Sequence, residues 1–404
     1  MVPYLRVANV LDGCIDYSDV YRMHFTHADE KKYSLRKGDI LLNEGQSTEL
    51  VGRSAIFDGQ EGEFCYQNSL VNFRCGPSVV PQFARAVFKR WLDIGHFTTI
   101  VKQTTSMAHL GGGRFARLDF PVPPLPEQRR IAEILDAVGD AIRKTEQLIA
   151  KLKQLKHGLL HDLFTRGIDE NGALRDPVGR ADQFRDSPWG SVPRSWSVGT
   201  LADHTEDIRY GTSAPSEAGV GSVPVLRIPN VQYGRIDLED LKFQNPSSAD
   251  LDRFGVQPGD LLVIRTNGNP HLLGRCAEVP REFRDRPCLF ASYLIRVRLA
   301  RARTIPSFVA LLLHSRPARG YIESRAATSA GNYNINTLQL RAMPVCLPSL
   351  NEQERIVASM HALERRLEFE AEEADKLRAL KNGLTEDLLT GRVRVTNLPK
   401  EDAA

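Results

Sequence analysis

Hydrophobic residues along the chain follow a spacing that predicts two long helices. From residue 131, and again from residue 356, apolar positions recur in alternating steps of four and three. This narrow stripe is typical of a helix that pairs with another helix. The first stripe consists of Ile131, Leu135, Val138, Ile142, Ile149, Leu152, Leu159 and Leu163, and the second of Ile356, Met360, Leu363, Leu367, Ala374, Leu377, Leu384 and Leu388.

A single stripe of this kind would most simply pack on the core of its own domain. Two copies in the same register, each with charged flanks, favour pairing of the helices with each other. Proline-rich segments precede both stripes, and Gly167 and Gly391 lie where a helix would end. We therefore predict helices at 126–167 and 349–391, each a rod of roughly 60 Å at about 1.5 Å per residue.

The two helices end two copies of one repeated unit. Residues 3–16 and 224–237 are identical at 8 of 14 positions, and residues 151–165 and 376–390 are identical at 9 of 15. Ordinary residue frequencies would give about one identity in the first comparison. The offset between the copies is 221 residues at first and 225 residues later. The chain is therefore an internal duplication.

Short apolar runs separated by Gly-Asp and Asn-Gly turns fill the regions between the helices. They predict an α+β fold with two globular domains in tandem, each followed by a long helix. The first domain would span 1–125 and the second 189–348, with a polar linker at 168–188 and a tail at 392–404. Because residues 189–223 have no counterpart in the first copy, we expect that copy to be short by one strand–turn segment or to start upstream.

The balance of charge excludes a uniformly basic coat for nucleic acid. The 404 residues include 53 Lys and Arg against 50 Asp and Glu, a net charge of +3, so any DNA-binding surface must be local. The six cysteines show no C-x2-C spacing, which predicts reduced thiols rather than a zinc site. No apolar run approaches about 20 residues and no signal segment is visible, so we expect a cytoplasmic protein without a membrane span.

Motifs that would carry chemistry are missing from the sequence. It contains no G-x-x-x-x-G-K-[ST] phosphate loop, no G-x-S-x-G elbow, no H-E-x-x-H helix and no Pro-Pro-aromatic motif of a DNA amino-methyltransferase. Residues 111–113, three glycines, follow no convincing strand and open no helix, so we interpret them as a flexible loop. We predict no catalytic and no metal-binding residues in this chain. A role in recognition or assembly is favoured instead.

A local excess of arginine makes the second domain the stronger candidate for DNA binding. Residues 265–303 hold nine arginines against three acidic residues. Guanidinium groups suit bidentate contacts to phosphate and guanine, and amides and hydroxyls suit adenine and other base edges. A solvated, partly salt-bridged strand face explains the charge equally well. The candidate DNA-binding residues are Arg265, Thr266, Asn267, Asn269, His271, Arg275, Ser329, Asn332, Tyr333 and Asn334, with Gln46, Ser47, Thr48, Gln103, Ser106 and Arg114 in the less basic first domain.

Both copies enter their helix through similar turns and close it with similar segments. PLPEQRRI at 124–131 corresponds to SLNEQERI at 349–356, and GLLHDLFTRG corresponds to GLTEDLLTGR at the helix ends. Together with two variable blocks, this doubled pattern resembles the specificity subunit of a type I restriction–modification system. The resemblance covers almost the whole chain. The sequence departs from the family's pattern in its short first domain and in SLNEQ, which is expected to loosen a turn.

The resemblance implies two target recognition domains, each binding one half of a split sequence in double-stranded DNA. It also implies that the two helices pair as an antiparallel coiled coil and act as a ruler between the domains. The helices would dock two methyltransferase subunits, on which motor-nuclease subunits assemble. The holoenzyme would then use S-adenosylmethionine, ATP and Mg²⁺, and this chain would bind no cofactor and no membrane.

Three other functions stay open from the sequence. A single-chain restriction enzyme with a fused methyltransferase is disfavoured by the missing motifs for binding a methyl donor. A coiled-coil scaffold would need only the repeat and the helices. Such a scaffold would be indifferent to DNA, whereas specific DNA binding weakens steeply with salt. A stand-alone or silent specificity gene is compatible with a short first domain.

Overall fold

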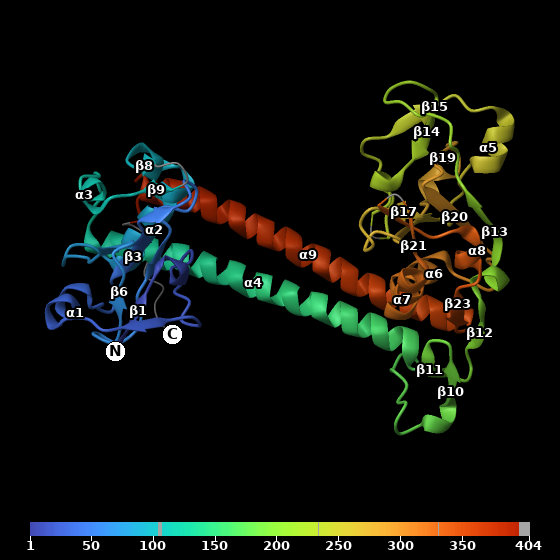
Figure 1. Ribbon diagram of the computed structural model, residues 1–404, viewed down its shortest axis with the longest axis horizontal. Helices are drawn as coiled ribbons and strands as arrows, with labels where there is room; N and C mark the ends of the chain where they lie inside the picture. The colour runs from blue at the N-terminus through green and yellow to red at the C-terminus, as the bar shows by residue number, and fades with distance from the viewer. Residues whose placement is uncertain (104–106, 233, 330, 396–404) are drawn as a thin grey trace. The chain divides into compact units, whose positions relative to one another are not determined.

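The computed structural model (Figure 1) describes residues 1–103, 107–232, 234–329 and 331–395. Short strands and helices of mixed length alternate along these residues, which confirms the α+β prediction. The two longest helices are α4 (Leu125–Thr165) and α9 (Leu350–Leu389). Each begins and ends within two residues of the bounds that the hydrophobic stripes predict.

The chain divides into two compact units. Unit 1 comprises Met1–Leu148 together with Glu370–Ala404, and unit 2 comprises Ile149–Phe369. Helices α4 and α9 therefore contribute one part of their length to each unit. Each unit thus contains one globular block, the first part of the long helix that follows this block, and the last part of the other long helix.

The described residues of unit 1 form three small sheets, with strand orders β2-β1-β6, β5-β3-β7 and β4-β9-β8. The elements are β1 (Val2–Leu5), β2 (Tyr21–Met23), α1 (His27–Tyr33), β3 (Ile40–Asn43), β4 (Gly45–Gln46), β5 (Ser54–Ile56), β6 (Cys65–Tyr66), β7 (Leu70–Phe73), α2 (Pro81–Asp93), β8 (Lys102–Gln103), β9 (Ala108–His109) and α3 (Gly112–Phe115).

The described residues of unit 2 repeat these sheets in the orders β15-β14-β19, β13-β20-β16-β18 and β17-β22-β21, and add the ribbons β10-β11 and β12-β23. The elements are β10 (Phe184–Ser187), β11 (Gly190–Pro193), β12 (Ser197–Thr200), β13 (Thr205–Tyr210), β14 (Val223–Leu226), β15 (Lys242–Gln244), α5 (Ser248–Phe254), β16 (Leu261–Ile264), β17 (Thr266–Asn267), β18 (Cys276–Glu278), β19 (Leu289–Phe290), β20 (Leu294–Leu299), α6 (Pro306–His314), α7 (Arg316–Arg325), β21 (Ala327–Ser329), β22 (Asn332–Asn334), α8 (Thr337–Arg341) and β23 (Pro344–Leu347).

The duplication extends to the direction of each strand pair. Strand β1 runs antiparallel to β2 and parallel to β6, and β14 runs antiparallel to β15 and parallel to β19. The central strands β3 and β16 are buried along their whole length, because their continuous apolar runs are covered on both faces. A helix with proline at its start, α2 or α6, then packs its apolar side into the core of each unit.

The two central sheets differ at one edge. In unit 2, β20 pairs with β13, and β23 pairs with β12. The described residues of unit 1 contain no counterpart of β12 and β13. Leu347 in β23 is 2% exposed, whereas Val122, the equivalent residue of unit 1, is 54% exposed. Among the described strands of unit 1, β7, the counterpart of β20, pairs only with β3, and Val122 lies outside any strand.

Helices α4 and α9 run antiparallel within unit 1. Glu127, near the start of α4, binds Arg394 just beyond α9, with 2.6 Å between Oε1 and Nε. Further along α4, Glu146 binds Arg378, which lies earlier in α9. All apolar positions of the two predicted stripes are buried or half-buried.

Polar positions of the stripes differ between the two units. In unit 2, Lys156 Nζ lies 2.6 Å from Glu364 Oε1 across the two helices. The equivalent lysine of unit 1, Lys381, faces Gly139, where a Cβ atom would lie 3.3 Å from the lysine Nζ. Burial is the main cause that lowers the pKa of Lys381. The same lysine is thus held by an ion pair in one copy and by packing in the other.

The glutamine of each turn before a long helix makes the same hydrogen bonds. Gln128 is fully buried, accepts from the backbone N–H of Val80 at the start of α2 and donates to the carbonyl of Pro123. Gln353 binds the start of α6 and the carbonyl of Pro348 in the same way. The SLNEQ turn therefore keeps the contacts of the PLPEQ turn.

Two segments without periodicity are more ordered than the sequence suggests. Residues 168–188, predicted to be a linker, pack on unit 2: Ile168 is 4% exposed, and strand β10 lies at the end of the segment. The interpretation of residues 111–113 as a flexible loop that opens no helix is wrong, because Gly112 begins the short helix α3. Within the described ranges, no helix has both the length and the apolar character needed to cross a bilayer.

Candidate nucleic-acid interface

Unit 2 carries a three-stranded antiparallel sheet that is rich in amide and hydroxyl groups. Strand β22 lies in the middle, between β17 and β21. The register brings together six candidates that lie far apart in the sequence: Thr266 opposite Asn334, Asn267 opposite Tyr333 and Ser329 opposite Asn332. Asn332 is exposed and Asn267 is half-buried, so amide groups reach the surface of this sheet. The side chain of Ser329 is outside the described part.

Arg265 lies directly before β17, and its carbonyl accepts from the backbone N–H of Ile335 directly after β22. Its guanidinium carbon is 4.5 Å from the ring centroid of Tyr210, and Nη1 donates to the carbonyl of Ser292 at 3.3 Å. The Tyr210 hydroxyl in turn accepts from the backbone N–H of Thr337 at 3.1 Å. The half-buried Arg265 is therefore fixed in orientation by a ring and a carbonyl.

The segment after β17 is a turn built by two asparagines. Asn267 Oδ1 accepts from the backbone N–H of Asn269 at 2.8 Å, and Asn269 Oδ1 accepts from the N–H of His271 at 3.0 Å. These contacts use amide oxygens, while Asn269 and His271 remain exposed beside the sheet. Arg275 precedes β18, its carbonyl accepts from the backbone N–H of Ile264 at 2.8 Å, and its charge is one of the causes that lower the pKa of His314 in α6.

Unit 1 has the equivalent sheet with fewer amides. Strand β9 lies between β4 and β8, and the register places Gln46 opposite Ala108 and Gly45 opposite His109. Gln46 is half-buried, and Ser47 and Thr48 follow it as exposed residues. Gln103 belongs to β8, but its side chain is not described. Ser106 lies outside the described residues.

The Arg114 guanidinium forms hydrogen bonds with backbone carbonyls of unit 1. Its Nε donates to the carbonyl of Ile100 and its Nη2 to the carbonyl of His109, both at 2.6 Å. These bonds tie the short helix α3 to β9 and to the loop before β8. Arg114 therefore stabilises the sheet more than it offers a charge to a ligand.

Glu44 and His109 form a hydrogen-bonded side-chain pair at this sheet that sequence reasoning missed. His109 Nδ1 lies 3.1 Å from Glu44 Oε2, and Glu44 Oε1 accepts from the backbone N–H of Gly111 at 3.3 Å. The His109 side chain is 39% exposed. The repeat could have identified both residues, since its offsets of 221 and 225 carry Arg265 back to Glu44 and Asn334 back to His109.

The arginine run of unit 2 does not form one basic surface. Arg296 is 1% exposed and binds Asp207, and burial lowers the pKa of its guanidinium. Arg298 binds Asp260, with 2.7 Å between Nη2 and Oδ2. These two arginines hold strand β20 to its neighbours. They fit the alternative explanation of the arginine run, a partly salt-bridged strand face. Exposed arginines of the run lie in the segment between β18 and β19, at 281, 284 and 286, and at 301 and 303.

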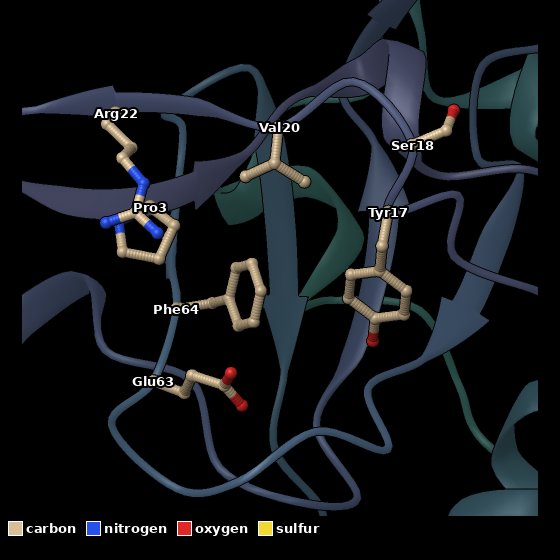
Figure 2. A pocket seen from close by; sticks show the side chains of 7 residues that line it. All are labelled: Pro3, Tyr17, Ser18, Val20, Arg22, Glu63 and Phe64. Carbon is tan, nitrogen blue, oxygen red and sulfur yellow. The ribbon is translucent and has the colours of Figure 1, made fainter.

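A shallow hollow in unit 1 offers no evident catalytic arrangement. Figure 2 shows its lining, with the charged side chains of Arg22 and Glu63 to one side and Tyr17 to the other. The Tyr17 hydroxyl donates to Asp58 Oδ1 at 2.8 Å. Across the described ranges, no group of three or more His, Cys, Asp or Glu side chains is placed to hold a metal ion.

Comparisons with known proteins agree on one family. The family model of the type I restriction modification DNA specificity domain matches residues 2–154. The chain is 26% identical to the EcoKI specificity subunit of Escherichia coli K12 over 97% of its own length and 82% of that protein. It is 25% identical to the putative MjaX specificity subunit of Methanocaldococcus jannaschii, over 97% and 87% of the two chains.

The fold is similar to that of a solved chain from a type I restriction–modification system, described in a study of complex assembly and conformational transition. The TM-score is 0.56 at 18% identity, and the match covers 97% of this chain and 92% of the solved one. This likeness confirms the arrangement of mixed domains and long helices.

Proposed function

We propose that this chain, which belongs to the specificity subunits of type I restriction–modification systems, reads a two-part DNA sequence with one unit for each half. The observation that supports this proposal is the duplicated polar sheet. Equivalent positions carry Gln46 and Asn267 on the first strand, and His109 and Asn334 on the middle strand. The two sheets have the same strand arrangement but carry different hydrogen-bond donors and acceptors. They should therefore prefer different bases.

The long helices have a separate role in this proposal. Their paired seam would fix the distance between the two recognition units and so the length of the spacer between the half-sites. Two methyltransferase subunits would dock on them, and motor-nuclease subunits would join through the methyltransferases. S-adenosylmethionine, ATP and Mg²⁺ would be bound by those partners. This chain would take no part in the chemistry, and the target base would be flipped out into a partner subunit.

Two single substitutions at equivalent positions test whether each unit recognises one half-site. We expect Asn267→Ala to relax one base position of one half-site, and Gln46→Ala to relax a position of the other half-site. Each loss should correspond to about 1–3 kcal/mol of discrimination, the range of a good amide–base contact. The measurement is genome-wide mapping of adenine methylation in cells that express each variant with its methyltransferase subunit.

The two variants control for each other. If both change the same half-site, or if neither changes the methylated sequence, the assignment of one half-site to each unit is wrong. A general loss of methylation at both halves in both variants would indicate a folding defect, which thermal unfolding of the purified chain would reveal.

A further inference from the structure

In the polar sheet of unit 1, a carboxylate holds one of the two ring nitrogens of an accessible histidine. His109 lies on the middle strand β9, opposite Gly45, and its Nδ1 is 3.1 Å from Oε2 of Glu44. The His109 side chain is 39% exposed, and that of Glu44 is 23% exposed. Among the described residues, none forms a hydrogen bond with Nε2 of the ring. One ring nitrogen is therefore held by the protein, and the other is left for a ligand.

The backbone around Glu44 fixes the position of its carboxylate. The Glu44 N–H donates to the carbonyl of Ser69 at 2.9 Å, and the Glu44 carbonyl accepts from the N–H of Leu110 at 2.8 Å. In the side chain, Oε1 accepts from the N–H of Gly111 at 3.3 Å. Each carboxylate oxygen thus has its own partner, Gly111 for Oε1 and His109 for Oε2.

The His109 ring is fixed as well. The His109 carbonyl accepts from Nη2 of Arg114 at 2.6 Å, which holds the strand in place. A Cβ atom added to Gly45 would lie 3.4 Å from Cε1 and 3.5 Å from Nδ1 of the ring, so the imidazole packs directly against this glycine. A side chain longer than that of alanine at position 45 would displace the ring from Glu44.

The contact between the two side chains determines which ring nitrogen carries the hydrogen. An ionised carboxylate only accepts hydrogen bonds, so the hydrogen between Oε2 of Glu44 and Nδ1 of His109 belongs to Nδ1. In a neutral imidazole only one nitrogen carries hydrogen, and Nε2 is then an acceptor. In the major groove of DNA, the groups that donate are the exocyclic amines, N6 of adenine and N4 of cytosine, whereas guanine and thymine present acceptors there.

We propose that Glu44 is a positioning residue that fixes the tautomer of His109, so that Nε2 accepts a hydrogen bond from the exocyclic amine of an adenine or a cytosine in the half-site of unit 1. The inference rests on the proposed function, in which this sheet reads DNA bases. It adds the chemical class of the base at one position and a role for a carboxylate that does not itself contact DNA.

The equivalent positions of unit 2 hold no such pair. Arg265 takes the place of Glu44 and stacks on Tyr210, and Asn334 takes the place of His109. An asparagine amide always presents both a donor and an acceptor, whereas the neutral imidazole presents at Nε2 whichever its neighbour leaves. A substitution at Glu44 should therefore reverse one contact in the half-site of unit 1, and the half-site of unit 2 serves as an internal control.

Glu44→Gln is the variant that reverses the contact. Its side-chain oxygen would keep the Gly111 N–H, so its amide NH₂ would face His109 and donate to Nδ1. The hydrogen of the neutral ring then moves to Nε2, which becomes a donor. We expect methylated sites to gain guanine or thymine at the position that carries adenine or cytosine with the wild type. The ratio of the two kinds of site should change roughly tenfold, as for one reversed base contact.

Two further variants identify the position and control for the lost charge. His109→Ala should relax the same position to all four bases and so shows which base the ring reads. Glu63→Gln is the matched control, because Glu63 is an exposed carboxylate of unit 1 that also accepts a backbone N–H, from Gln60, at 3.3 Å. It should leave both half-sites unchanged. The measurement is the genome-wide map of adenine methylation in cells that express each full-length variant with its methyltransferase subunit.

Nuclear magnetic resonance of the purified full chain, labelled with ¹⁵N-histidine, tests the tautomer without DNA. At about pH 8, where histidine side chains are ordinarily neutral, the spectrum distinguishes a ring nitrogen that carries hydrogen from one that does not. The signal of His109 is assigned by its loss in His109→Ala. We expect the hydrogen on Nδ1 in the wild type and on Nε2 in Glu44→Gln.

Failure of this inference is distinct from failure of the proposed function. A wild-type map with a split motif, in which His109→Ala changes no position or the position it relaxes holds guanine or thymine, overturns the inference and leaves the proposed function standing. An unchanged base preference in Glu44→Gln, or a hydrogen on Nε2 in the wild type, has the same consequence. If the wild type confers no split motif, the proposed function itself fails, and the inference fails with it.

Discussion

Replacement of Glu352 by alanine is expected to lower the free energy of unfolding of unit 2 by about 3–5 kcal/mol, the range for a buried ion pair that loses one partner. Glu352 is 4% exposed and receives both arms of Arg175, at 2.6 and 3.0 Å. Its Oε1 also accepts from the Trp196 indole N–H and from the backbone N–H of Ile168. Alanine would leave the Trp196 and Ile168 donors buried without this acceptor, and it would remove the carboxylate from Arg175, whose Nη1 would keep only the Arg166 carbonyl at 3.3 Å.

The equivalent residue of unit 1 provides a matched control. Glu127 is 3% exposed and binds Arg394, but the Arg394 side chain is 57% exposed. In Glu127→Ala the arginine could return to water, so we expect a smaller loss, of about 1–2 kcal/mol. Glu352→Gln, which keeps an acceptor oxygen, should lie between alanine and the wild type.

Urea unfolding followed by tryptophan fluorescence measures these differences, and Trp196 reports directly on the Glu352 network. Equal losses in Glu352→Ala and Glu127→Ala would show that burial of the donors does not determine the effect. A loss below about 1 kcal/mol in Glu352→Ala would contradict the account of the network.

Acid should destabilise unit 2 in a pH range set by His314. Burial, then the charges of Arg319, Arg275 and Lys156, lowers the pKa of His314 from 6.5 to about 4. The backbone N–H of Cys276 faces its Nε2 at 3.5 Å, which also suits a neutral ring. Because the unfolded chain binds the proton at a higher pH than the folded chain, stability is present above about pH 6.5 and is lost as the pH falls towards about 4.

The expected loss approaches about 3 kcal/mol over that range, since one pKa unit corresponds to about 1.4 kcal/mol. The midpoint of urea unfolding at pH 7 and at pH 4.5 measures it. His314→Gln keeps an acceptor without a titrating ring, so its midpoint should change less between the two pH values. If the midpoints of wild type and variant fall in parallel, the acid effect comes from other groups.

The sequence predicted the helices well because the physical pattern is long and occurs twice. A stripe of eight apolar positions over more than thirty residues leaves few alternatives to a paired helix, and the structure places both helices within two residues of the expected ends. The strands were harder to predict. Strands β4, β8, β9 and β17 have two residues each, too few to show any alternation of apolar and polar positions.

The sequence named the candidate residues, but neither their grouping in one sheet nor their contacts could be predicted from it. Amide-rich segments near 266 and 333 meet in one sheet because strand β17 pairs with strand β22. Composition does not distinguish a free guanidinium from one bound to a carbonyl or a buried carboxylate, as with Arg114 and Arg296. Glu44 and His109 were missed because their pairing depends on strand register, although the repeat offsets point to both.

The central claim is that this chain confers a two-part DNA sequence on its methyltransferase. The most direct measurement is a genome-wide map of adenine methylation in cells that express the methyltransferase subunit with this chain, compared with cells from which this chain is deleted. We expect a split motif, two different half-sites separated by a constant spacer, only in the presence of the chain. A map without a new motif, or a motif that persists after the deletion, would contradict the claim.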